Sequence, residues 1–200
     1  PPGNIVYIDP SGTTNGDGSY ENPYLSITGI QFESDHLYLL KKGTSCTIDK
    51  VIIDKDDILL GSYGLGDIPI IQSGTSEYVF KAIDHAGIEI EDLHIIAQNA
   101  ISCFYFLGPS CERISIKNCI VEGSDYGIRL INTKDVVFEF NTISNTQSGI
   151  FAMTEDIHMS YNIFSHNQCA VDIVSNKYPS AILNNVFYDN REAVRSSGVD

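Results

Sequence analysis

The second half of the chain carries a repeated unit that limits the folds open to it. A four-residue unit with an apolar residue in second place recurs at steps of 22, 21 and 23 residues. The units span residues 127–130, 149–152, 170–173 and 193–196, and residues 79–82 and 100–103 fit the same slot upstream. Repetition at this short period marks a solenoid, in which each repeat packs on its neighbours. Residues far apart in sequence then line up in columns, so a site should be sought down a column.

Between these units apolar and polar residues alternate, as in Ile114-x-Ile116 and Val136-x-Phe138. Alternation with a period of two indicates β-strands. Each repeat also has an Asn next to an apolar stretch, and stacked Asn side chains at a bend can hydrogen-bond from coil to coil. These residues are Asn118, Asn141, Asn162 and Asn185. Since no segment is long enough for a crossover helix, the sequence predicts an all-β parallel β-helix of about seven coils.

The first third of the chain reads differently. Residues 10–23 are rich in turn-forming dipeptides, and Tyr24–Phe32 is expected to hold one or two helical turns. An open solenoid needs a cap over its first core layer, so we expect a cap and first strand in residues 1–45 and coils in residues 46–200. The sequence up to Asp200 shows no obvious second cap. The lack of a cap favours a natural chain that continues, or end-to-end association through an uncapped C-terminal coil. The alternative expectation is a monomer.

Composition narrows the class of partner. The 200 residues suit one domain, and a formal net charge of −14 disfavours non-specific binding to nucleic acid. The sequence lacks an apolar run of roughly 18 residues, so no membrane span is predicted. The five cysteines have no zinc-type spacing. We interpret them as small apolar core residues, with a disulfide between Cys103 and Cys111 across residues 106–110 as the alternative.

The opening of the chain resembles a known family. Residues 7–12, 15–19 and 21–24, together with the turns at 61–64 and 66–71, look like the start of right-handed parallel β-helix proteins of the pectin-lyase-like superfamily. With the repeats, the resemblance covers nearly the whole chain and implies a single-stranded right-handed parallel β-helix. It further implies a secreted or cell-surface bacterial protein that acts on polysaccharide, with the substrate lying along one parallel sheet.

One column is the candidate site for that substrate. The third residue of each repeated unit should point to solvent, and successive coils should stack it about 4.8 Å apart. The column comprises Lys81, Ser102, Arg129, Phe151, Asp172 and Arg195, and Tyr126 and His166 lie in or beside the turns before it. Cations, a carboxylate and exposed rings suit a sugar, which has apolar faces and hydrogen-bonding edges. We therefore expect Phe151, Asp172, Tyr126 and His166 to contact a glycan; the alternative is a solvated sheet face.

Eliminative cleavage of a uronide polymer needs a base and a cation that stabilises the enolate. Lys81, Arg129 and Arg195 are the candidate catalytic residues, with predicted separations of two and three coils. A Lys–Arg pair one coil apart, and the acidic and Trp-containing motifs of well-known branches of the superfamily, are missing. The function predicted is thus a polysaccharide lyase-like protein without a complete catalytic set. The alternative is a non-catalytic glycan-binding, adhesin or spike-type β-helix.

Two clusters of oxygen-bearing side chains raise the question of a metal. Asp54, Asp56 and Asp57 form one, and residues 15–21 form a second through Asn, Asp, Ser and Glu. Calcium prefers six to eight oxygen ligands, and neither cluster completes a known loop. No cofactor is certain from the sequence. Calcium at Asp54, Asp56 and Asp57 is the metal hypothesis, and charged or turn-forming loops are the alternative.

Overall fold

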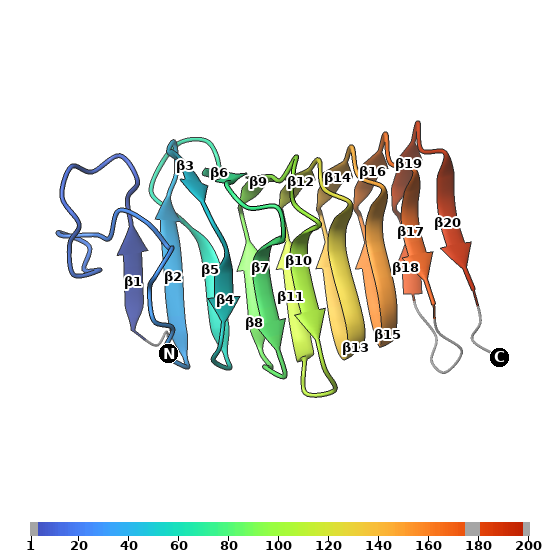
Figure 1. Ribbon diagram of the computed structural model, residues 1–200, viewed down its shortest axis with the longest axis horizontal. Helices are drawn as coiled ribbons and strands as arrows, with labels where there is room; N and C mark the ends of the chain where they lie inside the picture. Colours follow the sequence, from blue (N-terminus) through green and yellow to red (C-terminus); the bar gives the residue numbers. More distant parts are fainter. Residues whose placement is uncertain (1–3, 175–180, 198–200) are drawn as a thin grey trace.

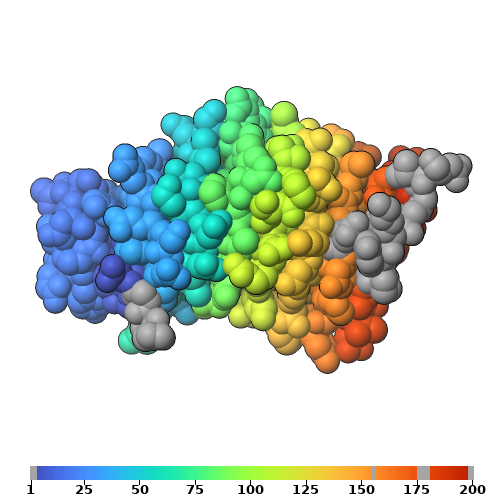
Figure 2. Space-filling view, turned by 90° about the horizontal axis from the view of Figure 1, so that it is seen from below, coloured from blue at the N-terminus to red at the C-terminus, as the bar shows by residue number. Residues whose placement is uncertain are grey.

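The computed structural model describes residues 4–174 and 181–197, and every regular element in these ranges is a β-strand. The chain winds through three faces, and each strand pairs in parallel with a strand of the same face one coil away. The coils follow one another along the long axis in sequence order (Figures 1 and 2). The parallel β-helix predicted from the sequence is confirmed. Within the described residues, no helix is long and apolar enough to cross a membrane.

The three faces are numbered in the order in which the chain meets them. Face 1 contains β1 (Ile5–Ile8), β2 (His36–Lys41), β5 (Ile58–Tyr63), β8 (Ile88–Glu91), β11 (Glu112–Lys117), the second halves of β13 (Tyr126–Glu139) and β15 (Ser148–Ser160), and β18 (Ala181–Leu183). Face 2 contains β3 (Ser45–Ile48), β6 (Ile70–Ser73), β9 (His94–Ile96), β12 (Ile120–Glu122), β14 (Thr142–Ser144), β16 (Ile163–Ser165) and β19 (Val186–Tyr188). Face 3 contains β4 (Val51–Ile53), β7 (Tyr78–Ile83), β10 (Ser102–Leu107), the first halves of β13 and β15, β17 (Cys169–Ile173) and β20 (Glu192–Ser196).

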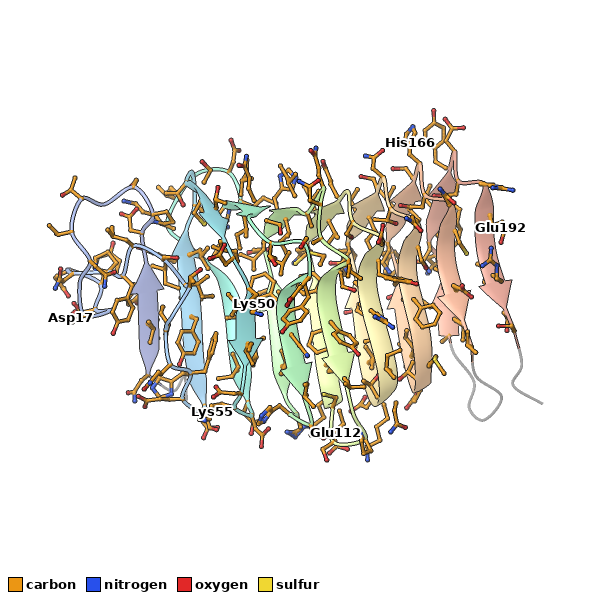
Figure 3. All side chains as sticks on the ribbon, viewed as in Figure 1. Asp17, Lys50, Lys55, Glu112, His166 and Glu192 are labelled. Carbon is orange, nitrogen blue, oxygen red and sulfur yellow. The ribbon has the colours of Figure 1, made fainter. Side chains whose placement is uncertain are left out.

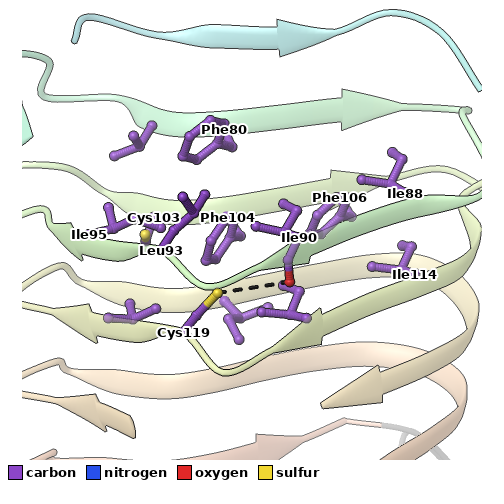
Figure 4. Close-up of a cluster of buried hydrophobic side chains, with 14 of the residues drawn as sticks. Phe80, Ile88, Ile90, Leu93, Ile95, Cys103, Phe104, Phe106, Ile114 and Cys119 are labelled. Carbon is purple, nitrogen blue, oxygen red and sulfur yellow. Dashed lines mark hydrogen bonds between the residues drawn. The ribbon is translucent and has the colours of Figure 1, made fainter. Parts of the chain in front are cut away.

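The core fills the space enclosed by the three faces. Alternate residues of each strand point inward, which places Phe80, Phe104 and Phe106 in a buried stack with ring centroids 5.6 and 6.5 Å apart (Figure 4). Isoleucines of the facing strands close around these rings. In the central part of each strand the residues between the inward ones point outward, so the core is matched by rows of side chains on the surface.

Buried Asn side chains hold the corner between faces 1 and 2. The amide of Asn141 contacts Asn162, and that of Asn162 contacts Asn185, at 3.0 and 2.9 Å between nitrogen and oxygen. The predicted ladder is therefore confirmed for these three residues. Asn118 is not part of it, because Cys119 occupies the ladder position and its backbone nitrogen donates to Asn141. Asn118 instead adopts a left-handed φ of 51° one residue earlier.

A second ladder stabilises the corner between faces 2 and 3. It was not predicted from the sequence. The Thr146 hydroxyl donates to the Asn167 side chain at 2.7 Å, and the Asn167 amide donates to Asn190 at 3.0 Å. Both Thr146 and Asn167 are buried. This corner is consequently rigid beneath the side chains that project from it.

The N-terminal segment covers the first core layer, as expected of a cap. Ile27 and Phe32 are buried against the first coils. The one or two helical turns expected over Tyr24–Phe32 are wrong: the segment forms turns and bends, with Gly29 at a φ of +83°. A left-handed residue cannot continue a right-handed helix, which accounts for the difference.

All five cysteines are free thiols, so the alternative of a Cys103–Cys111 disulfide is wrong. Cys103 points into the core beside Leu93 and Phe104 (Figure 4). Cys111 lies at the other end of β10, where its sulfur contacts the carbonyl oxygen of Leu107 at 3.2 Å. The two thiols lie at opposite ends of the strand and do not meet across a loop. Their burial agrees with the interpretation of these cysteines as core residues.

Candidate functional site

Face 3 carries a straight row of outward side chains, one per coil, which we call the central row. Strand register joins Ile52, Lys81, Tyr105, Arg129, Phe151, Asp172 and Arg195 in this order. The row therefore contains five of the six residues expected in the column. Arg129 lies two coils from Lys81 and three from Arg195, as predicted.

The sixth expected member, Ser102, is wrong, and Tyr105 takes its place. Ser102 lies three residues earlier, in the neighbouring row with Tyr78 and Tyr126. Five residues (97–101) separate β9 from β10, whereas three separate β12 from β13, so the unit at 100–103 lies ahead of the true slot. Phe104-Tyr105-Phe106 is itself an apolar-x-apolar unit, and this signal could have identified Tyr105 from the sequence.

Cations and aromatic rings alternate along the N-terminal part of the central row. The Lys81 ammonium lies 4.7 Å from the ring centroid of Tyr78 and 5.5 Å from that of Tyr105. The Arg129 guanidinium lies 5.0 Å from Tyr105 and 5.2 Å from the ring of Tyr126. These distances are within the range of cation–π attraction, which holds both cations without neutralising them.

The ring series continues toward the C-terminal coils. The Tyr126 ring meets the Phe151 ring edge-on at 5.5 Å between centroids. Beside them Met153 is 41% exposed on the same face. We refer to Tyr78, Lys81, Tyr105, Arg129, Tyr126 and Phe151 as the aromatic–cation strip. Among residues 4–174 and 181–197, no carboxylate forms a salt bridge with Lys81 or Arg129, so the strip is locally positive on an acidic protein.

A shallow pocket of about 180 Å³ opens into the strip. Its lining residues are Glu77, Tyr78, Ile101, Ser102, Tyr105 and Arg129. The Ser102 hydroxyl and the Arg129 Nε atom are both buried and make no hydrogen bond within the described part of the chain. Buried polar groups normally have partners, so these two atoms stand out among the residues that line the pocket.

The C-terminal end of the central row is electrostatically different. Arg195 forms ion pairs with Glu192 at 2.7 Å and with Asp172 at 3.3 Å. Its positive charge is therefore offset by two carboxylates, although the Asp172 Oδ1 atom is buried and makes no hydrogen bond. Of the three cations predicted as catalytic, Lys81 and Arg129 share the strip, and Arg195 belongs to a separate ion-pair cluster on β17 and β20 (Glu192 in Figure 3).

His166 does not face the central row. It projects from the corner between faces 2 and 3 (Figure 3), where its ring meets Tyr188 at 5.7 Å and its Nε2 atom lies 3.8 Å from Asp189. It is 54% exposed. The corner is adjacent to the strip, so the residue flanks the site without forming part of it.

The three carboxylates of the metal hypothesis point to separate protein partners. Asp57 pairs with Arg113 at 2.9 Å, and Asp54 pairs with Lys55 at 3.5 Å. Asp56 accepts the backbone N–H of Ala86, and this bond, with a weaker contribution from His85, lowers the pKa of the carboxyl. Within the described ranges no three or more His, Cys, Asp or Glu side chains are grouped to hold a metal ion.

The second oxygen-rich cluster is a turn. The Asp17 carboxylate accepts the backbone N–H of Ser19 at 3.0 Å, and the Asn15 side chain accepts that of Leu25 at 2.9 Å. Both oxygens therefore shape the backbone of the cap. This geometry agrees with the turn interpretation of residues 15–21.

The fold and the repeated rows define a class of protein. The chain belongs to the family described as right handed beta helix region, which it matches over residues 24–199. It is similar to GH136 lacto-N-biosidase from Eubacterium ramulus in two solved structures, with TM-scores of 0.71 and 0.64 and identities of 14% and 13%. Each match covers 86% of this chain and 43% of the lacto-N-biosidase chain.

A weaker likeness joins the chain to the A-module of the mannuronan C-5 epimerase AlgE4 from Azotobacter vinelandii. The TM-score is 0.42 at 12% identity, over 83% of this chain and 60% of the epimerase module. No curated protein matches the sequence. At 14% identity the similarity to the lacto-N-biosidase shows the fold alone, and the chain spans less than half the length of that protein.

Proposed function

We propose that face 3 binds an acidic glycan along the aromatic–cation strip. The observation that carries the proposal is the pair of cations, Lys81 and Arg129, held between tyrosine rings without a carboxylate partner in the described residues. Both cations are partly buried, and a ligand carboxylate would supply the anionic partner that they lack.

The rings account for the sugar part of the ligand. A pyranose presents C–H groups on its faces, which pack on aromatic side chains, and hydroxyls at its edges, which hydrogen-bond. Tyr78, Tyr105 and Tyr126 offer such rings on three consecutive coils, in two neighbouring rows, with 6.4 Å between the ring centroids of Tyr78 and Tyr105. The pocket beside Ser102 offers donors for an edge or carboxylate oxygen. A chain lying across the coils would meet rings and donors in alternation.

The protein's net charge of −14 does not oppose this assignment. Charges beyond a Debye length of about 8–10 Å are largely screened at physiological salt, so the local charge dominates binding. The carboxylates near the central row have cationic partners of their own: Asp172 and Glu192 pair with Arg195 at its C-terminal end, and Glu77, beside the pocket, pairs with Lys50 at 3.0 Å. The similar fold of a lacto-N-biosidase supports a glycan partner, and such a partner fits a secreted or cell-surface location.

Eliminative cleavage is the second candidate function, favoured by one observation. Tyr105 lies on the coil between those of Lys81 and Arg129, and both cations contact its ring. A uronide carboxylate paired with Arg129 would gain stabilisation as its enolate forms. Tyr105 in its phenolate form would accept the proton from the carbon next to that carboxylate, and a carbon–carbon double bond would form as the glycosidic C–O bond breaks. The leaving oxygen would take the electron pair of that bond and a proton from the Lys81 ammonium. Binding without turnover is the alternative, as in an adhesin or spike segment.

Calorimetric titration with oligosaccharides of uronic acid residues tests the proposal. We expect Arg129→Gln to weaken binding about tenfold, the size of loss typical of a single charge-assisted contact. Arg113→Gln is the matched control, because Arg113 is a half-exposed cation on face 1 that pairs with Asp57. Equal affinities for the two variants and the unmodified protein would overturn the proposal. Ultraviolet absorbance of unsaturated product in the same samples separates cleavage from binding.

A further inference from the structure

The corner between faces 2 and 3 holds a groove that lies beside the strip but differs from it in chemistry. Its volume is about 390 Å³, and it spans the turns of successive coils. The side chains that line it include Gln98, Asp125, Asn145, Gln147, His166 and Gln168. Within this lining there is no lysine or arginine and one carboxylate, so the groove is polar without being strongly charged.

Backbone geometry creates the hollow. Asn145 and His166 have left-handed φ values of 57° and 58°, which project their side chains outward at the corner. Gly123, with a φ of +77°, holds the matching place one coil earlier and has no side chain to project. A Cβ atom there would lie 3.1 Å from the Cγ of Gln98. The glycine therefore lets Gln98 lie close against the corner, where a side chain at residue 123 would crowd it.

The side chains beneath the groove are hydrogen-bonded to one another, whereas some side chains that line its sides have hydrogen-bonding groups that are unpaired within the described part of the chain. Beneath it, Thr146 and Asn167 satisfy one another in the buried ladder. Of the wall residues, Gln147 donates to Asp125 at 2.7 Å. The side chains of Gln98 and Gln168 make no hydrogen bond to the residues that the structure describes. A primary amide offers two donors and an acceptor, so the walls present paired donors and acceptors over a rigid base.

We propose that this corner groove binds a neutral sugar unit through the amide side chains of Gln98, Gln147 and Gln168. Vicinal hydroxyls both donate and accept, which matches amides and leaves no charge to compensate. An anionic ligand would lack a cation here, and a metal ion would lack carboxylates.

The groove joins the strip through the backbone of β13. Asp125 and Tyr126 are consecutive, and their N–H groups donate to Ala100 and Ile101, the latter lining the pocket on face 3. The inference rests on the proposed function in one respect: the neutral unit is assigned to the same glycan that the strip binds. A glycan with both acidic and neutral residues, as neighbours or as a branch, would then occupy both surfaces.

Nuclear magnetic resonance of the side-chain amides tests the groove directly. The protein is titrated separately with neutral oligosaccharides of glucose, xylose, mannose, galactose and N-acetylhexosamine, and then with a uronic acid oligosaccharide. We expect at least one neutral oligosaccharide to shift the amide signals of Gln98, Gln147 and Gln168. The amide of Gln72, exposed on β6 of face 2, serves as the internal control and should not move.

Two variants make the result specific. Gly123→Asn introduces the residue type that the chain uses at the next coil, Asn145, and its side chain would displace that of Gln98. It should weaken neutral binding at least tenfold without lowering the melting temperature greatly. Gln72→Ala should have no effect. Failure of every neutral oligosaccharide to move the three amides, or equal binding by Gly123→Asn, would overturn the inference.

The same titrations separate this inference from the proposed function. Shifts confined to the strip with the acidic oligosaccharide would leave the proposed function standing and overturn the groove. Shifts confined to the groove with a neutral oligosaccharide would support the groove and contradict the acidic strip.

Discussion

At the scale of single residues, the buried asparagines contribute most to order along the axis. Asn162 is fully buried; its amide donates to Phe138 and Asn185, and its side-chain oxygen accepts from the backbone and side chain of Asn141. We expect Asn162→Ala to lower the free energy of unfolding by about 2–4 kcal/mol, since several buried groups lose their partners. Urea denaturation measures the loss. Asn99→Ala, at an exposed turn, is the control, and a similar small effect of both would contradict the role of the ladder.

The thiol of Cys119 gives the fold a predicted response to alkaline pH. Burial raises its pKa from 9.0 to about 12 in the folded chain. The folded state therefore keeps a proton that the unfolded state loses, and the stability from this group is complete below pH 9 and declines above it. Between pH 8 and pH 10.5 the loss amounts to about 2 kcal/mol.

Urea denaturation of the unmodified protein and of Cys119→Ala across this pH range isolates that contribution from those of other titrating groups. We expect the difference in stability between the two proteins to narrow as the pH rises. A constant difference would show that the thiol titrates alike in both states.

At the scale of the strand, two glycines permit the close approach of coils at the start of face 3. A Cβ atom on Gly149 would lie 2.5 Å from the carbonyl oxygen of Ala170, and one on Gly127 would lie 2.6 Å from that of Gly149. Backbone cannot move aside as a flexible side chain can, so we expect Gly149→Ala to cost about 2–4 kcal/mol.

Gly29→Ala provides the comparison for that substitution. Its Cβ would meet nothing within 4 Å, but its φ is +83°, so it measures left-handed strain alone, about 1 kcal/mol. Thermal unfolding of both variants tests the argument. A melting temperature for Gly149→Ala as high as that for Gly29→Ala would contradict the steric argument.

Most of the central row could be predicted from the sequence. Five members of the central row followed from the sequence because inward apolar pairs fix which intervening residue faces out. Tyr105 did not, since the longer turn at residues 97–101 shifted the apparent slot by three residues. The groove was not predicted either. It depends on which turn residues of successive coils come together at one corner, and the contact between Gly123 and Gln98 cannot be read from the sequence.

At the scale of the whole molecule, the solenoid turns a sequence repeat into two adjacent surfaces of different chemistry. The strip on face 3 offers rings and unpaired cations, and the corner groove offers amides. Both arise because each coil adds one side chain to each row. The likeness to larger β-helix proteins establishes the architecture, while the proposed ligand follows from these rows.

The proposed glycan site on face 3 is tested by two variants, Tyr105→Ala and Tyr161→Ala. The dissociation constant for a uronic acid oligosaccharide is measured for each. Tyr105 is the middle ring of the strip, whereas Tyr161 is a half-exposed ring that stacks on Phe140 at the opposite corner. We expect about tenfold weaker binding for Tyr105→Ala, a loss that persists at raised salt. We expect unchanged binding for Tyr161→Ala. Equal affinity of the two variants would contradict a glycan site on face 3.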